Sequence, residues 1–244
     1  KTVTVKRLED GSVYTEPYDK LILSPGAKAI VPPFPGIENN KIFTLRTVED
    51  TYRIREYIEE HKPGRAVVVG GGFIGIEMAE NLIHWGIDTT LLQRENQIML
   101  PFDYDMACEM HSYLRGKGMD LRVNAEVNGF SEERGKVVTH LKKGDAIEAD
   151  FVILAIGVTP DTKLAEKAGL ELGIRGAVRV NEFMQTSDPD IYAAGDAVEV
   201  KNFVTGERTL VSLAGPANKQ GRIAADNICG RHSTFKGSQG SSVL

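Results

Sequence analysis

The central stretch of the chain reads RAVVVGGGFIGIE, residues 65–77. Its first five residues end in three β-branched valines, and this run predicts a buried strand. Residues 74–85 predict a helix that ends before Gly86, and residues 89–93 predict the next strand. Strand, turn, helix and strand in this order are typical of a βαβ unit with parallel strands. The turn carries three glycines that match the pattern G-x-G-x-x-G, namely Gly70, Gly72 and Gly75.

The spacing of these glycines has a specific physical meaning. The first makes a tight turn, the second lets backbone approach a pyrophosphate, and the third lets the helix pack closely on the strand. The helix that begins near Phe73 would direct its N-terminal amides at the phosphates. On this motif alone, a ligand-free glycine turn or a methyltransferase loop stays open. The predicted strand before the loop and helix after it favour a dinucleotide site.

The ribose end of such a site usually carries an acidic residue, about 20 residues after the first glycine. Here the strand ends at Gln93 and Arg94 instead. Gln93 can hydrogen-bond a ribose, and Arg94 can pair with a 2′-phosphate or lie solvated beside the adenine. The choice between NAD and NADP therefore stays open. Glycine at position 75 and the lack of a second basic residue nearby favour NAD.

Composition and charge restrict the class of protein. A chain of 244 residues can form one large domain or two modest ones. The net charge of −5 without a basic tract argues against nucleic-acid binding. The longest apolar run, residues 151–158, is too short to cross a membrane, and no stretch predicts a secretory signal. Because the chain opens at Lys1 on a strand-like pattern, we expect a fragment or a processed chain, with tag removal as the alternative.

The remaining segments predict a mixture of short strands and helices. Val31–Gly36 shows neither the helical nor the strand period of apolar residues. Because this stretch is rich in proline and glycine, we expect a domain boundary near residues 27–45. The helix over residues 47–61 is expected to begin at Thr47 as its N-cap. Short alternating pieces between residues 121 and 146 predict antiparallel strands. Further expected elements are a hairpin over 2–18, strands over 21–23, 151–156, 178–180 and 191–194, helices over 105–114 and 221–228, and another strand beginning in 237–244.

No metal site and no redox-active cysteine are expected. The five histidines lack metal-ligand spacing and are interpreted as surface or packing residues. Cys108 and Cys229 both fall in predicted helices, and we interpret them as small buried packing residues. Two isolated cysteines fit a reducing, cytoplasmic setting better than a disulfide framework.

Four stretches, which follow one another along the chain in the family's order, resemble a known family, the pyridine nucleotide-disulfide oxidoreductases. Gly70–Glu77 resembles the signature of the nicotinamide domain, and Leu21–Gly26 the strand and turn that lead out of the FAD domain. Phe151–Pro160 resembles the segment that closes the nicotinamide domain, and Thr186–Asp196 the second FAD-contact motif. Leu213–Arg222 resembles the corresponding segment of one subgroup, which holds coenzyme A disulfide reductases, NADH oxidases, NADH peroxidases and persulfide reductases. If the chain were a methyltransferase, the matches at residues 186–196 and 213–222 would have to be accidental.

The resemblance implies an α/β fold with a Rossmann-like three-layer nicotinamide-binding domain plus part of a second, FAD-binding domain of related fold. It implies that the family's N-terminal FAD-phosphate loop, the redox cysteine after it and the C-terminal dimerisation domain are missing, so no catalytic residue is expected in this chain. The implied parts are residues 1–40 of the FAD domain, 41–159 as the NAD(P)H domain, 160–232 as the returning FAD segment, and 233–244 as the start of the dimerisation domain.

By the same resemblance, Phe73 is an aromatic gate over the flavin and Glu77 meets the nicotinamide carboxamide. Simple helix packing and a solvated surface charge are the respective alternatives. Gly157 would let backbone approach the nicotinamide, unless it is an ordinary strand-end turn. The full set implied to bind NAD(P)H is Gly70, Gly72, Phe73, Ile74, Gly75, Glu77, Gln93, Arg94, Ile156 and Gly157.

On the flavin side, Asp196 is implied to hydrogen-bond a ribityl hydroxyl of FAD, with a helix N-cap as the alternative. The stretch near Ala217 would place amides at the pyrimidine edge of the flavin, unless it is an uninvolved loop. The full set implied to bind FAD is Ser24, Pro25, Gly26, Gly195, Asp196, Leu213, Ala214 and Ala217.

The function implied is that of the NAD(P)H-binding portion of a flavin-dependent enzyme. The parent enzyme would pass hydride from NAD(P)H to FAD and on to a disulfide, persulfide or oxygen/peroxide acceptor. A homodimeric parent is expected, with no nucleic acid or membrane as partner. The fragment itself is expected to lose FAD and to be incompetent alone. The alternative is an isolated dinucleotide-binding module with no catalytic activity of its own.

Overall fold

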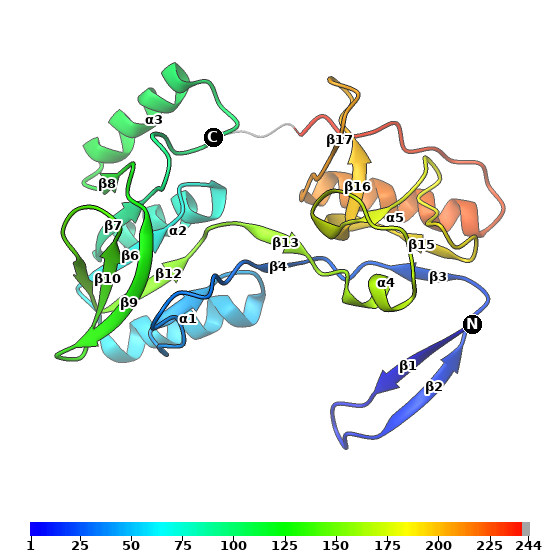
Figure 1. Ribbon diagram of the computed structural model, residues 1–244, viewed down its shortest axis with the longest axis horizontal. Helices are drawn as coiled ribbons and strands as arrows, with labels where there is room; N and C mark the ends of the chain where they lie inside the picture. The colour runs from blue at the N-terminus through cyan, green and yellow to red at the C-terminus, as the bar shows by residue number, and fades with distance from the viewer. Residues whose placement is uncertain (241–244) are drawn as a thin grey trace. The chain divides into compact units, whose positions relative to one another are not determined.

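The computed structural model describes residues 1–240, which divide into two compact units (Figure 1). The middle unit is formed by residues 29–158, and the split unit by residues 1–28 together with residues from 159 onward. The first boundary lies before the expected position at residue 40, because Phe34 and Ile37 pack against a core cluster of the middle unit. The second boundary lies after residue 158, one residue before the expected end of the NAD(P)H domain at residue 159.

A five-stranded parallel sheet is the framework of the middle unit, in the order β5-β12-β6-β7-β8. The prediction of antiparallel strands over residues 121–146 is wrong at its start, since β8 pairs in parallel with β7. A helix lies between β7 and β8, so their connection is a crossover. The strands are β5 (Ile42–Thr44), β6 (Arg65–Val69), β7 (Asp88–Leu92), β8 (Asp120–Arg122) and β12 (Phe151–Leu154).

Helices α1 (Val48–His61), α2 (Phe73–His84) and α3 (Tyr104–Gly116) pack on one face of this sheet. The predicted N-cap of α1 is confirmed: Thr47 Oγ1 accepts from the Asp50 amide at 3.3 Å, and Asp50 accepts from the Thr47 amide at 3.0 Å. The shared core joins sheet and helix residues, among them Ala66, Val68, Leu91, Ile54, Ala79, Leu82 and Leu114.

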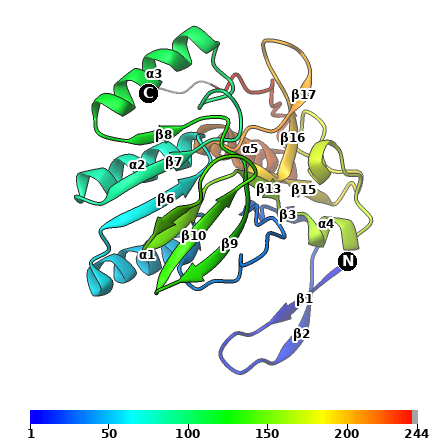
Figure 2. The same cartoon turned by 60° about the vertical axis from the view of Figure 1, so that its left-hand side comes forward.

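A three-stranded antiparallel sheet packs on the opposite face (Figure 2). It consists of β9 (Val127–Glu133), β10 (Lys136–Leu141) and β11 (Ile147–Ala149). Val67 and Val69 alternate along β6 with the residues that face the helices, and they join this second core. Helices, parallel sheet and antiparallel sheet therefore form three layers, which confirms the predicted architecture.

The split unit has its own core beneath smaller sheets. β3 (Leu21–Leu23) pairs in parallel with β15 (Ile191–Ala193), while β1 (Thr2–Lys6) and β2 (Val13–Pro17) form the predicted hairpin. The other elements are β14 (Val178–Arg179), β16 (Val198–Lys201), β17 (Arg208–Thr209), α4 (Lys163–Lys167) and α5 (Ala214–Ile228), with one-turn 3₁₀ helices over Ile174–Gly176 and Gly195–Ala197.

β4 (Ala27–Ala29) pairs with β13 (Val158–Pro160), and the two boundaries between the units fall within these strands. The strand predicted in the tail is represented by a bridge between Ser238 and Asn202, and its residues 241–244 lie outside the described part. Within residues 1–240, no helix combines the length and apolarity needed to cross a membrane.

Candidate dinucleotide site

The carboxyl ends of three parallel strands meet at one edge of the middle unit. The Gly70 amide donates to Leu92 O at 2.8 Å, which ties the end of β6 to the end of β7. The Ala155 amide donates to Val69 O at 2.8 Å, which ties the end of β12 to the end of β6. This edge is where ligands bind in open α/β sheets. The structure thus brings together the predicted residues of the glycine loop, of positions 93–94 and of positions 156–157.

Two glycines of the loop are required by close backbone packing. Gly70 has a φ of +113°, and a Cβ there would lie 2.3 Å from Ala155 O. A Cβ on Gly75 would lie 1.8 Å from Gly70 O, so the first turn of α2 rests directly on the loop. The roles inferred for the first and third glycines, a tight turn and close helix packing, match this geometry.

The second glycine of the fingerprint faces open space. A Cβ on Gly72 would meet no described atom within 4 Å, and the residue has ordinary extended backbone with a φ of −89°. Gly72 is also the N-cap of α2, whose N-terminus receives no cap from a described side chain and has no acidic residue in its first turn. Open space before uncapped amides fits an approaching phosphate, because these amides and the helix dipole favour negative charge.

The Gln93 side chain is buried against the glycine loop rather than facing the solvent. It is 7% exposed, and its Oε1 accepts from the Gly71 amide at 2.9 Å. Its Nε2 donates to Glu95 Oε2 at 3.0 Å. Since both polar atoms already have partners, the side chain holds the glycine loop in place. Its predicted contact with a ribose stays a prediction.

Arg94 is paired with an acidic residue that the sequence pattern does not single out. Its Nε and Nη2 donate to Glu95 Oε1 at 2.8 and 2.5 Å. This hydrogen bond and the negative charge of Glu95 raise the pKa of the Arg94 guanidinium. Glu95 is the second residue after Gln93, so a search for an acidic group just beyond the strand end would have found it.

The segment after Glu95 forms the floor of the glycine loop. The Met99 amide donates to Gly71 O at 2.8 Å, and a Cβ on Gly71 would lie 2.5 Å from Ile98 Cγ2. The Ile98 amide donates to His111 Nε2 at 3.2 Å. Burial, and next the charge of Arg115, lower the pKa of His111, which favours the neutral ring that this acceptor role requires. His111 is therefore a buried packing residue, as the sequence predicts.

The remaining residues predicted for NAD(P)H lie around the same edge. Phe73 is 39% exposed on the first turn of α2, and Glu77 is exposed one turn further along. Ile156 packs against the second core of the middle unit, and Gly157 is exposed with a φ of +109°. The contacts of these residues with a ligand stay predictions.

The residues predicted for FAD gather in the split unit. Ser24, Pro25 and Gly26 follow β3, and Gly195 follows its neighbour β15. The Gly195 amide donates to Oε1 of Gln220 at 2.7 Å, and Gln220 is a 1% exposed residue of α5. A second buried glutamine thus fixes a glycine amide beside a predicted site, and no sequence pattern indicates this role.

The N-terminus of α5 supplies the last part of that set. The helix begins at Ala214 rather than at the predicted residue 221. Pro216 and Gly221 weaken the helical signal in the sequence, but the buried face of the helix includes Gln220 and Ala224. Leu213 is its N-cap, and no described side chain caps the amides that follow. Ala214 and Ala217 lie in the first turn, where the Ala217 amide already donates to Leu213 O at 3.2 Å, so this stretch is a helix start and not a loop.

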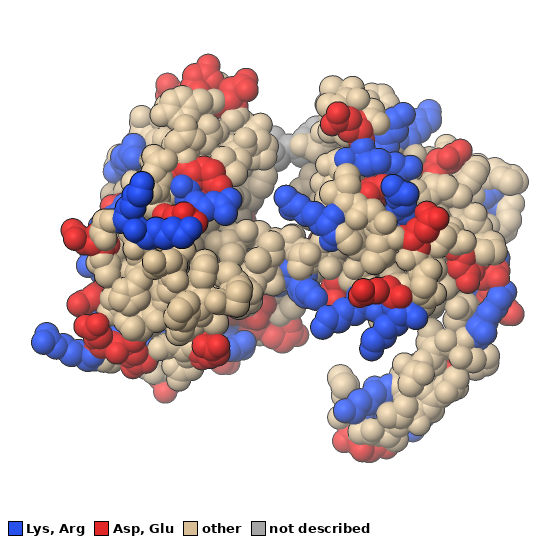
Figure 3. All heavy atoms as spheres, in the orientation of Figure 1, with Lys and Arg blue, Asp and Glu red and all other residues tan. Residues whose placement is uncertain are grey.

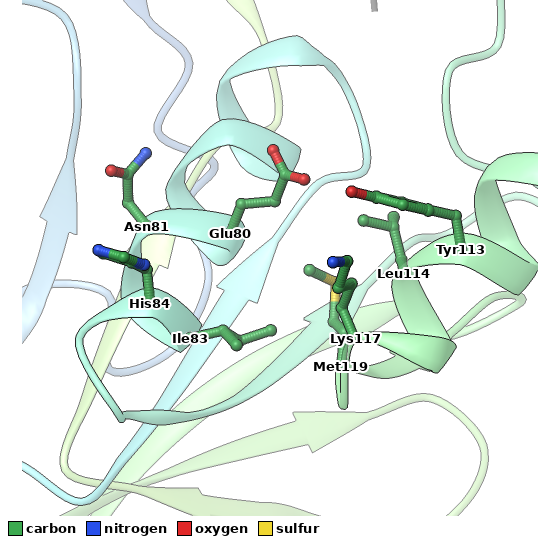
Figure 4. A pocket seen from close by; sticks show the side chains of 8 residues that line it. All are labelled: Glu80, Asn81, Ile83, His84, Tyr113, Leu114, Lys117 and Met119. Carbon is green, nitrogen blue, oxygen red and sulfur yellow. The ribbon is translucent and has the colours of Figure 1, made fainter.

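A pocket of about 380 Å³ lies away from this edge (Figure 4). In Figure 4, Glu80 and Ile83 of α2 face Tyr113 and Lys117 at the end of α3. These residues lie toward the C-terminal end of α2, whereas the glycine loop meets its N-terminus. The pocket is therefore separate from the candidate site. Its lining residues are Glu80, Asn81, Ile83, His84, Tyr113, Leu114, Lys117 and Met119.

Lys and Arg side chains are interspersed with Asp and Glu on the face shown in Figure 3. In the described residues, no group of three or more His, Cys, Asp or Glu side chains is placed to hold a metal. Cys108 is half-buried in α3, but Cys229 is exposed where α5 ends. The prediction that Cys229 is buried is therefore wrong.

The family comparison excludes one alternative that the glycine loop leaves open, the methyltransferase loop. Residues 1–221 match the family described as pyridine nucleotide-disulphide oxidoreductase. The chain belongs to this family. The match spans the glycine loop and every residue predicted for FAD, so the methyltransferase interpretation is wrong and the resemblance seen in the sequence is confirmed.

Several members of the family are close relatives. The chain is 39% identical over 228 residues to the NADH oxidase of Methanocaldococcus jannaschii, covering 93% of this chain and 50% of that protein. It is 33% identical to the coenzyme A disulfide reductase of Staphylococcus haemolyticus, covering 100% of this chain and 54% of that protein. The solved structure of reduced Bacillus anthracis CoADR-RHD is similar with a TM-score of 0.96 and 52% identity, covering 99% of this chain and 43% of that chain. The chain spans about half the length of the curated relatives it matches.

Proposed function

We propose that this family member is the NAD(P)H-binding portion of a flavin-dependent oxidoreductase. The whole enzyme passes hydride from NAD(P)H to FAD and on to a small-molecule disulfide, persulfide or oxygen-type acceptor. When bound, the nicotinamide and flavin rings supply the hydride chemistry, and the protein supplies binding and orientation. The observation that carries the proposal is the glycine loop, closed to any side chain at Gly70 and Gly75 and open at Gly72.

The residues of the middle unit fit a dinucleotide in a definite order. Gly72 leaves room for the pyrophosphate in front of the amides of α2. Arg94 and Glu95 follow β7, where the adenine ribose lies in this type of site. Phe73 and Glu77 present their side chains along one face of α2, where they would meet the nicotinamide end. Gly157 would keep the backbone close to that ring.

The split unit fits part of a flavin site. Gly195 has a φ of +84°, and a Cβ there would meet no described atom within 4 Å, so its backbone is accessible to a ligand. The uncapped start of α5 directs partial positive charge outward, which would favour an anionic reduced flavin. Only two parallel strands, β3 and β15, border this site in the described residues, and Ile22 of β3 is 40% exposed. Parallel sheets are ordinarily larger and covered on both faces, so we infer that further strands complete the site.

The acceptor is proposed by analogy with named relatives. They include NADH oxidases, coenzyme A disulfide reductases and a coenzyme A polysulfide/persulfide reductase of Pyrococcus horikoshii. The homodimeric state of the whole enzyme, and residues 233–244 as the start of its dimerisation domain, also stay proposals.

A visible absorption spectrum of the purified chain, before and after addition of FAD and NADH, tests this assignment. We expect no flavin band and no retained FAD, because the flavin site is only partly built. We also expect NADH to bind, as judged by a change in its fluorescence. A flavin band that bleaches with NADH would contradict the partial site, and it would mean that the residues present suffice to build the flavin site or that another chain completes it. Binding of neither nucleotide would contradict the NAD(P)H-binding role itself.

A further inference from the structure

A buried histidine of α3 holds the segment that lies beneath the glycine loop. His111 is 5% exposed, and its Nε2 accepts from the Ile98 amide at 3.2 Å. The Ile98 side chain is fully buried, and its Cγ2 fills the space next to Gly71, where a Cβ would lie 2.5 Å away. The following amide, that of Met99, donates to Gly71 O at 2.8 Å. The imidazole is therefore linked to the loop through two consecutive residues.

The backbone of this segment is strained at Met99. Its φ of +49° lies in the left-handed region, which is unfavourable for a residue that carries a Cβ. Such a conformation persists only where surrounding contacts fix it. On one side the turn is closed by Phe102, whose amide donates to Met99 O and whose carbonyl accepts from Gln97 Nε2, both at 2.9 Å. On the side of α3 it is fixed by His111, so without this contact the segment can relax and move Gly71 with it.

The contact between His111 and Ile98 requires a neutral ring. A neutral imidazole has one nitrogen that accepts a hydrogen bond, whereas an imidazolium has two donors and no acceptor. Protonation of His111 would set its Nε2–H against the Ile98 N–H. Burial, and next the charge of Arg115 one turn further along α3, lower the pKa of His111. The contact is therefore complete near neutral pH and is lost only on the acid side of the ordinary histidine value of about 6.5.

Arg115 is the charged residue that acts on the protonation of His111. The other titratable groups on the elements around the ring have partners of their own or line the pocket at the C-terminal end of α3. They are Cys108 with Tyr104 on α3, Glu95 with Arg94 beside the floor segment, Asp120 with Arg122 on β8, and Glu80 and His84 on α2.

We propose that His111 is a positioning residue for dinucleotide binding, because its neutral ring holds the segment that keeps Gly71 in place for the pyrophosphate. The inference rests on the proposed NAD(P)H-binding function and deepens it by adding a dependence on pH. When the ring becomes charged, its contact with Ile98 is lost, the glycine loop loosens and NADH should bind more weakly. The loss is partial, because Gln93 still accepts from the Gly71 amide at 2.9 Å.

The test is the Kd of NADH, measured by fluorescence titration at about pH 7.5 and at about pH 5 for each protein. For the wild type we expect the Kd to rise about fivefold at the lower pH, which is part of what one buried hydrogen bond can contribute. His111→Gln keeps a side-chain acceptor that does not titrate, so its Kd should change less than about twofold between the two conditions. His111→Leu keeps the apolar volume without an acceptor, so it should bind NADH about fivefold more weakly already at the higher pH.

His84→Gln is the matched control, because it removes an exposed histidine of α2 and should leave the wild-type pH profile unchanged. A folded His111→Leu that binds NADH as tightly as the wild type at the higher pH would overturn the inference. A loss of affinity in acid that persists in full in His111→Gln would overturn it as well. A wild-type protein that binds no NADH at either pH would overturn the proposed function, and the inference with it. Circular dichroism at both pH values identifies any loss of binding that comes from unfolding.

Discussion

Gly70→Ala should destabilise the middle unit by about 3 kcal/mol or more. The residue has a φ of +113°, which disfavours any side chain. Its Cβ would also lie 2.3 Å from Ala155 O and 2.6 Å from Ala155 C. Both atoms belong to the backbone at the end of β12, so neither can turn aside. The loop, or the strand beside it, must move.

Urea unfolding followed by circular dichroism measures this loss, and Gly144→Ala separates its two causes. Gly144 belongs to the same unit and has a φ of +94°, but no described atom lies within 4 Å of a Cβ there. It should therefore report the backbone strain alone, on the order of 1–2 kcal/mol. If Gly70→Ala costs no more than Gly144→Ala, the close packing of loop and strand plays no part in stability.

Glu199→Ala should destabilise the split unit by about 2–3 kcal/mol. The Glu199 side chain is 2% exposed, and its Oε2 accepts from the Ile174 amide at 2.7 Å. Its Oε1 accepts no hydrogen bond from the described residues, but Arg179 and Arg208 lie at 3.8 and 3.7 Å. Alanine would leave the amide without an acceptor and remove the anion between the two guanidinium groups.

Glu199→Gln is the matched variant for this position. It keeps the volume and an acceptor for the Ile174 amide, so its loss in the same urea measurement should be clearly smaller than that of alanine. Equal losses for the two variants would show that charge alone matters. A loss below about 0.5 kcal/mol for Glu199→Ala would contradict the role of the buried carboxylate.

The sequence predicts the layers of the middle unit well because their signals are strong and local. The valine-rich run Arg65–Val69 and the glycine spacing determine the βαβ unit without reference to the rest of the chain. Thr47 as a helix cap also depends only on its neighbours. By contrast, β5 and β8 have three residues each, too few to show a period, and their pairing depends on distant partners.

The side-chain contacts of the candidate site could not be predicted in the same way. Gln93 accepts a hydrogen bond from the Gly71 amide, and Gln220 accepts one from the Gly195 amide. In both pairs the two residues are more than twenty positions apart in the sequence. The period of apolar residues in a sequence does not indicate which polar side chains are buried. The same holds for Glu95, which matters only because its carboxylate reaches both Arg94 and Gln93.

The most direct test of the proposed dinucleotide site is the Kd of NADH for the wild-type protein and for Gly72→Ala. Alanine is free of clashes at this position and should change stability by less than about 1 kcal/mol. Its methyl group would nevertheless occupy the space proposed for the pyrophosphate, so we expect NADH to bind at least about tenfold more weakly. Equal affinity of a folded Gly72→Ala variant would contradict the placement of the dinucleotide at the start of α2.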